Sequence, residues 1–94
     1  MRFHLPFDDV QWSKAAKHHA AMRSYLHRLR EQYPPRSASQ RKLLKQLREF
    51  IQDFGRELLK PHDRIDASRL NALAASVIRT AVDYIVAHEA PGIG

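Results

Sequence analysis

The sequence predicts an all-α protein, an antiparallel three-helix bundle forming one domain over residues 1–94, and three observations support this fold class. Apolar residues recur at helical spacing in three long segments. Each segment is preceded by a capping residue and followed by proline. The chain contains only three glycines, so it offers few permissive turns between long elements. The connections are short, which favours antiparallel neighbours.

The first helix is expected over residues 9–33. Asp8 is a capping residue and Gln11 follows three positions later, as in a capping box. Phe7 and Trp12 occupy the two positions of a hydrophobic staple. A pair of prolines then ends the helix. Its apolar stripe, spaced alternately by three and four, consists of Trp12, Ala15, His19, Met22, Leu26, Leu29 and Tyr33.

The second helix is expected over residues 39–60. Ser37 and Gln40 have the spacing of another capping box, and Ser39 is a competing cap. A proline follows the last helical residue. Gly55 lies near the edge of the apolar face and is expected to let another helix approach closely. That face consists of Leu44, Leu47, Ile51, Phe54 and Leu58, flanked by Leu43 and Phe50.

The third helix is expected over residues 66–89, with Asp66 as its cap and Asp63 as the alternative. Its inner face consists of Leu70, Leu73, Ala74, Val77, Ala81, Tyr84 and Ile85. A second apolar strip consists of Ala75, Ile78, Val82 and Val86. A helix that is apolar over more than half its circumference must be buried on two sides. The strip is therefore expected to form an interface, either within the bundle or in a homodimer that pairs through the third helix.

A basic segment, Arg23–Arg48, carries the whole net charge of the chain. It holds eight bases and one acid, a net charge of +7, whereas the remaining residues hold eight bases and nine acids, a net charge of −1. In an antiparallel pair of helices these bases collect at one end of the molecule. Such a concentration of positive charge indicates an acidic partner.

Helix electrostatics account for part of this basic segment. A cation in the last turn of the first helix, such as Arg30, suits the helix dipole. Spacing along the second helix predicts the ion pairs Lys45–Glu49 and Asp53–Arg56. By contrast, bases in the first turn of the second helix oppose its dipole, which favours an external anion. The residues expected to contact a polyanion are Arg36, Arg41, Lys42, Lys45 and Arg48.

Catalytic, metal and cofactor sites find no support in the sequence. No two of the six histidines share a helical face at His-x-x-x-His spacing, and no carboxylate completes a metal set. His19 lies in the apolar stripe and is expected to be a neutral core residue with one satisfied hydrogen bond. Glu49, Asp53 and Glu57 form a row expected to face solvent, where burial cannot tune a general acid or base. We therefore expect a protein that is not an enzyme.

Other features bear on the compartment. Residues 1–7 alternate polar and apolar side chains and are expected to form an extended arm, because Pro6 prevents a helix there. They contain no apolar run long enough for a signal peptide, and no stretch of the chain is judged apolar enough to span a membrane. Cysteine is absent, so no disulfide forms. The expectation is a soluble cytoplasmic protein.

The sequence favours a non-catalytic bundle that binds a polyanion, foremost nucleic acid or a nucleoprotein complex, through the basic segment. It contains no zinc-finger spacing, no glycine-containing helix-turn-helix turn and no aromatic RNA-binding motif. Contacts to backbone phosphate are therefore expected rather than contacts to bases. The alternative is a protein–protein interaction module, an adaptor or a small inhibitor of the kind that mobile elements encode. It would use the apolar strip of the third helix or the basic end.

Overall fold

The computed structural model describes residues 7–89 and is built from three long helices and one turn of 3-10 helix. α1 spans Asp9–Gln32, α2 spans Ala38–Leu58, η1 spans His62–Arg64 and α3 spans Ala67–Glu89. This range contains no strand, so the predicted all-helical class with three helices is confirmed. The extended arm expected over residues 1–7 lies outside the described residues, apart from Phe7 at its end.

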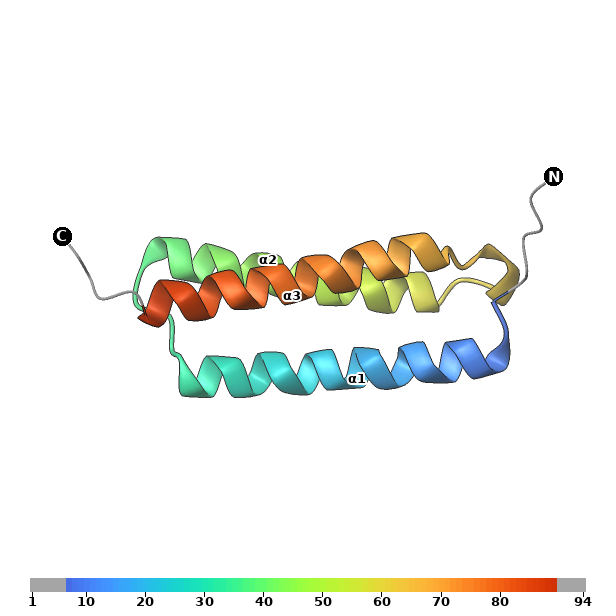
Figure 1. The fold of residues 1–94 in the computed structure, drawn as a ribbon, viewed down its shortest axis with the longest axis horizontal. Coiled ribbons are helices and arrows are strands. Elements are labelled where there is room, and N and C mark those ends of the chain that lie inside the picture. The colour runs from blue at the N-terminus through green and yellow to red at the C-terminus, as the bar shows by residue number, and fades with distance from the viewer. Residues whose placement is uncertain (1–6, 90–94) are drawn as a thin grey trace.

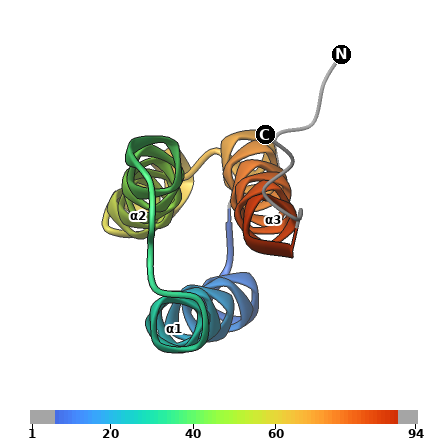
Figure 2. The same ribbon diagram turned by 90° about the vertical axis from the view of Figure 1, so that its left-hand side faces the viewer.

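The three helices lie side by side along the long axis of the molecule (Figure 1). The chain crosses the molecule along α1, returns along α2 and crosses again along α3, so the α1–α2 turn and η1 lie at opposite ends. Viewed end on, the helices occupy the corners of a triangle (Figure 2). α2 packs far more extensively on α3 than on α1. The bundle is therefore a tight pair of helices with a third helix laid along it.

The start of α1 forms the capping box that the sequence predicts. Asp8 Oδ1 accepts a hydrogen bond from the Gln11 N–H at 2.8 Å, and Gln11 Oε1 accepts one from the Asp8 N–H at 3.0 Å. Phe7 is buried, and Trp12 packs against the same apolar cluster, as a hydrophobic staple requires. Trp12 Nε1 also donates to the Leu58 carbonyl at 2.8 Å, which ties the start of α1 to the end of α2.

The capping box expected at the start of α2 is only half formed. Ser37 caps the helix, because its Oγ accepts from the Gln40 N–H at 3.1 Å. The Gln40 side chain has other partners: Oε1 accepts from the Arg36 N–H at 2.6 Å and Nε2 donates to the Ala87 carbonyl at 3.4 Å. The alternative cap, Ser39, only approaches Ser37, with 3.2 Å between their hydroxyl oxygens. Gln40 thereby joins the start of α2 to the end of α3.

A buried carboxylate closes the joint between α2 and α3. The Glu57 side chain is 2% exposed, and its Oε1 lies 2.9 Å from Lys60 Nζ and 3.3 Å from Arg69 Nε. Its Oε2 accepts from the Asp66 N–H at 3.0 Å. The expectation that Glu57 faces solvent is wrong, because the chain turns back after α2 and the start of α3 covers this side of the helix.

Burial and hydrogen bonding act on Glu57 in opposite directions. Burial disfavours the charged carboxylate and by itself raises the pKa. The hydrogen bond from Asp66 and the positive charges of Lys60 and Arg69 outweigh burial, so the pKa of Glu57 lies below its ordinary value. Asp66 is the cap of α3, as predicted, since its Oδ1 accepts from the Arg69 N–H at 3.2 Å.

The core consists of two apolar clusters placed one after the other along α2. The buried residues of the cluster near η1 are Phe7, Ala15, Phe54, Leu58, Ile65, Leu70 and Leu73. Those of the cluster near the α1–α2 turn are Leu29, Leu44, Leu47, Ile51, Val77, Ala81 and Tyr84. Within α1 only Ala15 and Leu29 are buried, and the rest of its apolar stripe is half-buried. The stripe thus faces the core, but α1 buries fewer of its residues than α2 or α3.

The last turns of α3 hold the C-terminal end of α1. Tyr84 is fully buried, and its hydroxyl donates to the Tyr33 carbonyl. His88 lies against the same turn, with Nε2 2.9 Å from the Pro34 carbonyl oxygen and Nδ1 3.1 Å from the Tyr84 carbonyl oxygen. Burial raises the pKa of Tyr84, although the positive charge of Arg30 acts in the opposite direction. The phenol therefore stays protonated and remains a hydrogen-bond donor.

The second apolar strip of α3, predicted as an interface, is open to solvent in this single chain. All four of its residues are exposed, and Ile78, Val82 and Val86 expose 65%, 52% and 55% of their surface. By length and composition alone α3 is also apolar enough to cross a membrane, which is weak evidence for a span. A core helix passes the same test, and α3 buries six of its residues in the bundle.

Candidate functional site

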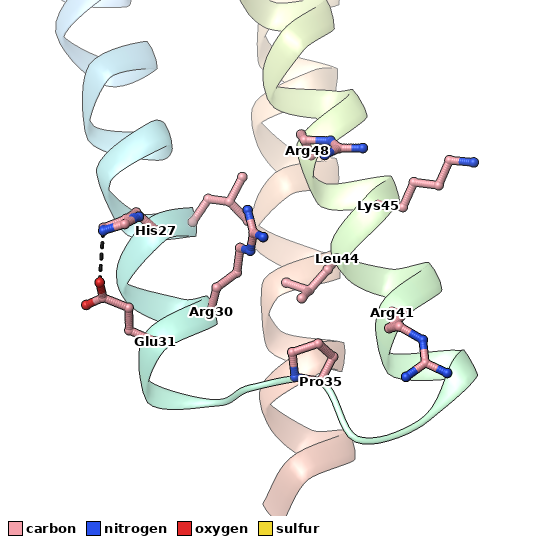
Figure 3. A pocket seen from close by; sticks show the side chains of 9 residues that line it. His27, Arg30, Glu31, Pro35, Arg41, Leu44, Lys45 and Arg48 are labelled. Carbon is pink, nitrogen blue, oxygen red and sulfur yellow. Dashed lines mark ion pairs between the residues drawn. The ribbon is translucent and has the colours of Figure 1, made fainter.

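Half of the eight basic residues of the segment Arg23–Arg48 line a hollow between α1 and α2, beside the turn that joins these helices (Figure 3). Its volume is about 580 Å³. It is lined by Leu26, His27, Arg30, Glu31, Pro35, Arg41, Leu44, Lys45 and Arg48. Figure 3 shows the α1 residues on one side and the α2 bases on the other, with Pro35 in the turn between them.

A second hollow, of about 650 Å³, continues from the first along the same two helices. The two hollows share Leu26, His27, Arg30 and Arg48. The second adds Arg23 and Arg56, and it reaches Trp12 and Leu58 near the other end of the molecule. Together they form one groove, which we name the α1–α2 groove. It carries basic side chains on both walls and along most of its length.

The positive charge of the groove is largely uncompensated. Among its lining residues Glu31 is the only carboxylate, and it lies 2.9 Å from His27 Nε2. The predicted pair between Asp53 and Arg56 is present, with 3.4 Å between Oδ1 and Nη1. The predicted pair between Lys45 and Glu49 does not form. The other basic residues of the groove, Arg23, Arg30, Arg41, Lys45 and Arg48, make no ion pair with any residue between 7 and 89.

The structure divides the expected polyanion contacts into two sets. Three of them line the groove, and these are Arg41, Lys45 and Arg48. They follow one another at helical spacing beside the buried apolar face of α2, so packing that face on the core directs them to the groove wall. Arg36 and Lys42 are exposed but line neither hollow.

Three groove residues were not among the expected contacts: Arg23, Arg30 and Arg56. The sequence accounts for Arg30 by the dipole of α1 and for Arg56 by its pair with Asp53. The signal that could have found Arg23 and Arg30 is their position beside the apolar stripe of α1. Arg23 and Arg30 flank the half-buried residues Met22 and Leu26 of α1, and this edge of the stripe borders α2.

His19 contacts α2 in the middle of the groove. Its imidazole stacks on Phe54, with ring centroids 6.1 Å apart and planes 10° apart. A Cβ placed on Gly55 would lie 2.7 Å from His19 Nε2, so the glycine makes room for this ring. The expected core histidine with a satisfied hydrogen bond is not found, because the ring is half-buried and its nitrogens bond to no residue between Phe7 and Glu89. The close approach expected at Gly55 is thus made by a side chain.

No group of three His, Cys, Asp or Glu side chains in the described range is placed to hold a metal ion. The most buried carboxylate, Glu57, is fully engaged in the joint between α2 and α3.

Comparisons of the chain with protein-family models, with curated proteins and with solved structures found no match. Two surfaces of the molecule are candidates for a functional role, the groove and the apolar strip of α3.

Proposed function

We propose that the protein is a non-catalytic helical bundle that binds nucleic acid through the basic side chains at the α1–α2 groove and its adjoining turn. The observation that carries the proposal is the set of bases on both groove walls without an ion-pair partner in residues 7–89. The proposal takes α1 and α2 as antiparallel neighbours. The hydrogen bond from Trp12, at the start of α1, to Leu58, at the end of α2, supports this order.

Arginine predominates among the groove bases, and it suits phosphate because its planar guanidinium donates two parallel hydrogen bonds. Binding that neutralises phosphates releases the counterions condensed on the nucleic acid. Neither hollow presents a protruding helix that could enter a major groove and read base edges. We therefore expect contacts to the phosphate backbone and little dependence on base sequence.

The test is a fluorescence-anisotropy titration with labelled DNA and RNA at several salt concentrations. With about four phosphate contacts to duplex DNA, the plot of log affinity against log salt should have a slope of about −3.6. Absence of binding to any nucleic acid at about 50 mM salt, where electrostatic binding is strong, contradicts the proposal.

We propose as a second function that the apolar strip of α3 pairs two copies of the chain. The exposure of Ile78, Val82 and Val86 favours this, since side chains of this size are seldom exposed together on a monomer. Ile78 also lines an apolar hollow of about 570 Å³ between α1 and α3, which extends the surface available to a partner.

Charges beside the strip favour an antiparallel pair of α3 helices. Arg79 and Asp83 lie one turn apart on the same flank of the strip, and neither makes an ion pair with a residue in 7–89. If two α3 helices cross in opposite directions with Val82 at the centre, Arg79 of one copy lies beside the partner's Asp83. The geometry repeats itself across the twofold axis, as an isologous interface requires.

Sedimentation velocity tests this pairing. Wild-type protein should sediment as a dimer, and Val82→Glu should sediment as a monomer because it buries an unpaired charge. Arg79→Asp and Asp83→Arg should each weaken the dimer, whereas the double exchange should restore it. A wild-type monomer at all concentrations refutes the pairing and leaves the alternative of another protein as the partner, which a pull-down after nuclease treatment would identify.

A further inference from the structure

The α1–α2 groove is longer than the basic end from which the nucleic-acid proposal starts. Its α2 wall carries basic residues from Arg41 to Arg56, which at about 1.5 Å of rise per residue is roughly 22 Å. Its α1 wall carries Arg23, His27 and Arg30, which by the same rise span about 10 Å. The basic residues are thus spread along the groove instead of clustered at one point. This distribution suits a ligand that is itself extended.

Beyond Arg48 the groove also contains aromatic side chains. His19 lines its middle and Trp12 lines its far end, and both are half-buried. The indole N–H of Trp12 is already bonded to Leu58, and its ring stacks on His62 with centroids 6.1 Å apart, so Trp12 can offer a ligand only the part of the ring that remains exposed. A positively charged groove that leads to accessible aromatic ring surface suits single-stranded nucleic acid, because phosphates can contact the basic side chains and a nucleobase can stack on a ring.

The shape of the site distinguishes a single strand from a duplex. A protein that recognises duplex DNA commonly places a protruding helix or ribbon in a major groove about 12 Å wide. Here the basic side chains line hollows between two helices, and two other basic residues, Arg36 and Lys42, line neither hollow. We expect a single strand to lie lengthwise in such a groove and a duplex to contact only its rims.

We propose that the ligand of the α1–α2 groove is a single strand of nucleic acid, lying lengthwise with phosphates on the arginines and a base against Trp12. This inference rests on the proposed nucleic-acid function and names the form of nucleic acid that the same site takes. To make every contact, the bound strand must be long enough to reach from Arg41 to Trp12.

The experiment uses the intrinsic fluorescence of the full chain, because Trp12 is its only tryptophan. The protein is titrated with oligothymidylates of about 4 to 16 nucleotides, the range of known single-strand sites, and with a duplex of equal length. Strands that span the groove should change Trp12 fluorescence and bind about tenfold tighter than the duplex. Tighter binding of the duplex, or strand binding that leaves Trp12 fluorescence unchanged, overturns the inference.

Two double variants with equal loss of charge provide the matched comparison. Arg41→Gln with Arg48→Gln removes two groove bases, and Arg36→Gln with Lys42→Gln removes two bases that line neither hollow. All four side chains are exposed, and circular dichroism checks that both variants keep the helical fold. The groove variant should lose about tenfold more strand affinity, and its salt slope should become shallower by about 1.4 for two lost contacts. Equal losses in the two variants overturn the inference.

The two proposals fail in different ways. If neither strand nor duplex binds at low salt, the nucleic-acid function itself is wrong. If the duplex binds best and the off-groove variant loses as much affinity as the groove variant, the function stands and the single-strand assignment is wrong.

Discussion

At the scale of single residues, Glu57 has the most consequential environment in the molecule. Its carboxylate receives Lys60, Arg69 and the Asp66 N–H within 3.3 Å, although the side chain is 2% exposed. The sequence placed Glu57 in a solvent-facing row because helical spacing describes one helix alone. It carries no information about which segment folds back over the end of that helix. Only the tertiary path of residues 59–66 explains the burial.

We predict that Glu57→Gln lowers the free energy of unfolding by about 1–3 kcal/mol, because it leaves polar groups at this joint without a charged partner. Glu49→Gln is the matched control, since Glu49 is exposed on the same helix and should change stability by less than about 0.5 kcal/mol. Urea unfolding followed by circular dichroism measures both. Similar effects for the two variants would contradict the assigned role of Glu57.

The lowered pKa of Glu57 gives this contribution a pH dependence of definite sign. A depressed folded-state pKa stabilises the protein above the ordinary carboxyl pKa of 4.5, and this stabilisation is lost as pH falls through the folded-state pKa. The difference in unfolding free energy between wild type and Glu57→Gln should therefore be constant above that value and shrink below it. A difference that grows as the solution is acidified would show that burial, which raises the pKa, dominates.

The effect of replacing Gly55 on stability depends on His19, whose side chain packs against it. Alanine has a higher helix propensity than glycine by about 1 kcal/mol, so Gly55→Ala alone would be expected to stabilise α2. The added methyl would lie 2.7 Å from His19 Nε2, and the imidazole must move off Phe54 to avoid it. We predict that Gly55→Ala destabilises the wild type but stabilises the His19→Ala variant. Thermal unfolding of the four proteins measures this coupling, and additive effects would contradict it.

At the scale of elements, the sequence predicts the direction of each helix face but not its depth. The apolar stripe of α1 does turn toward the core, yet within this helix only Ala15 and Leu29 are buried. Periodicity defines an angle around a helix axis, and it says nothing about the distance to the neighbouring helix. The position of α1 depends instead on its two ends, where Trp12 bonds to Leu58 and Tyr33 accepts from Tyr84.

We predict that Tyr84→Phe loosens the C-terminal half of α1. The change keeps the buried ring and removes only the hydroxyl that donates to Tyr33, so stability should fall by about 0.5–1.5 kcal/mol. Hydrogen exchange should rise most in the last turns of α1 and little in the middle of α2, because local opening follows the lost anchor. Tyr25→Phe is the control, since Tyr25 is exposed on α1, the helix whose hydrogen exchange is expected to rise. Uniform acceleration along the chain would contradict a local anchor.

At the scale of the whole molecule, the sequence locates the charge but not the groove. The concentration of bases in Arg23–Arg48 predicts a basic end, and Arg41, Lys45 and Arg48 do come together there. The groove continues to Arg56 and Trp12 because α1 packs on α2 less extensively than α3 does, which leaves a channel between the edges of α1 and α2. The distribution of charge is thus a property of the sequence, whereas the channel depends on how closely two helices pack.

The groove and the apolar strip belong to different helices, and this separation leads to a final prediction. In a dimer paired through α3, each copy keeps its own α1–α2 groove, so a long strand can occupy both grooves and gain from the raised effective concentration. Val82→Glu should then leave the affinity for a strand that fills one groove within about twofold of wild type, while the affinity for a strand long enough to bridge both should fall at least about tenfold. Anisotropy titrations with short and long oligothymidylates, on protein whose oligomeric state is known from sedimentation, measure both. Loss of short-strand affinity in Val82→Glu would mean that the two surfaces are not independent, and an unchanged long-strand affinity would mean that pairing through α3 does not bring two grooves onto one strand.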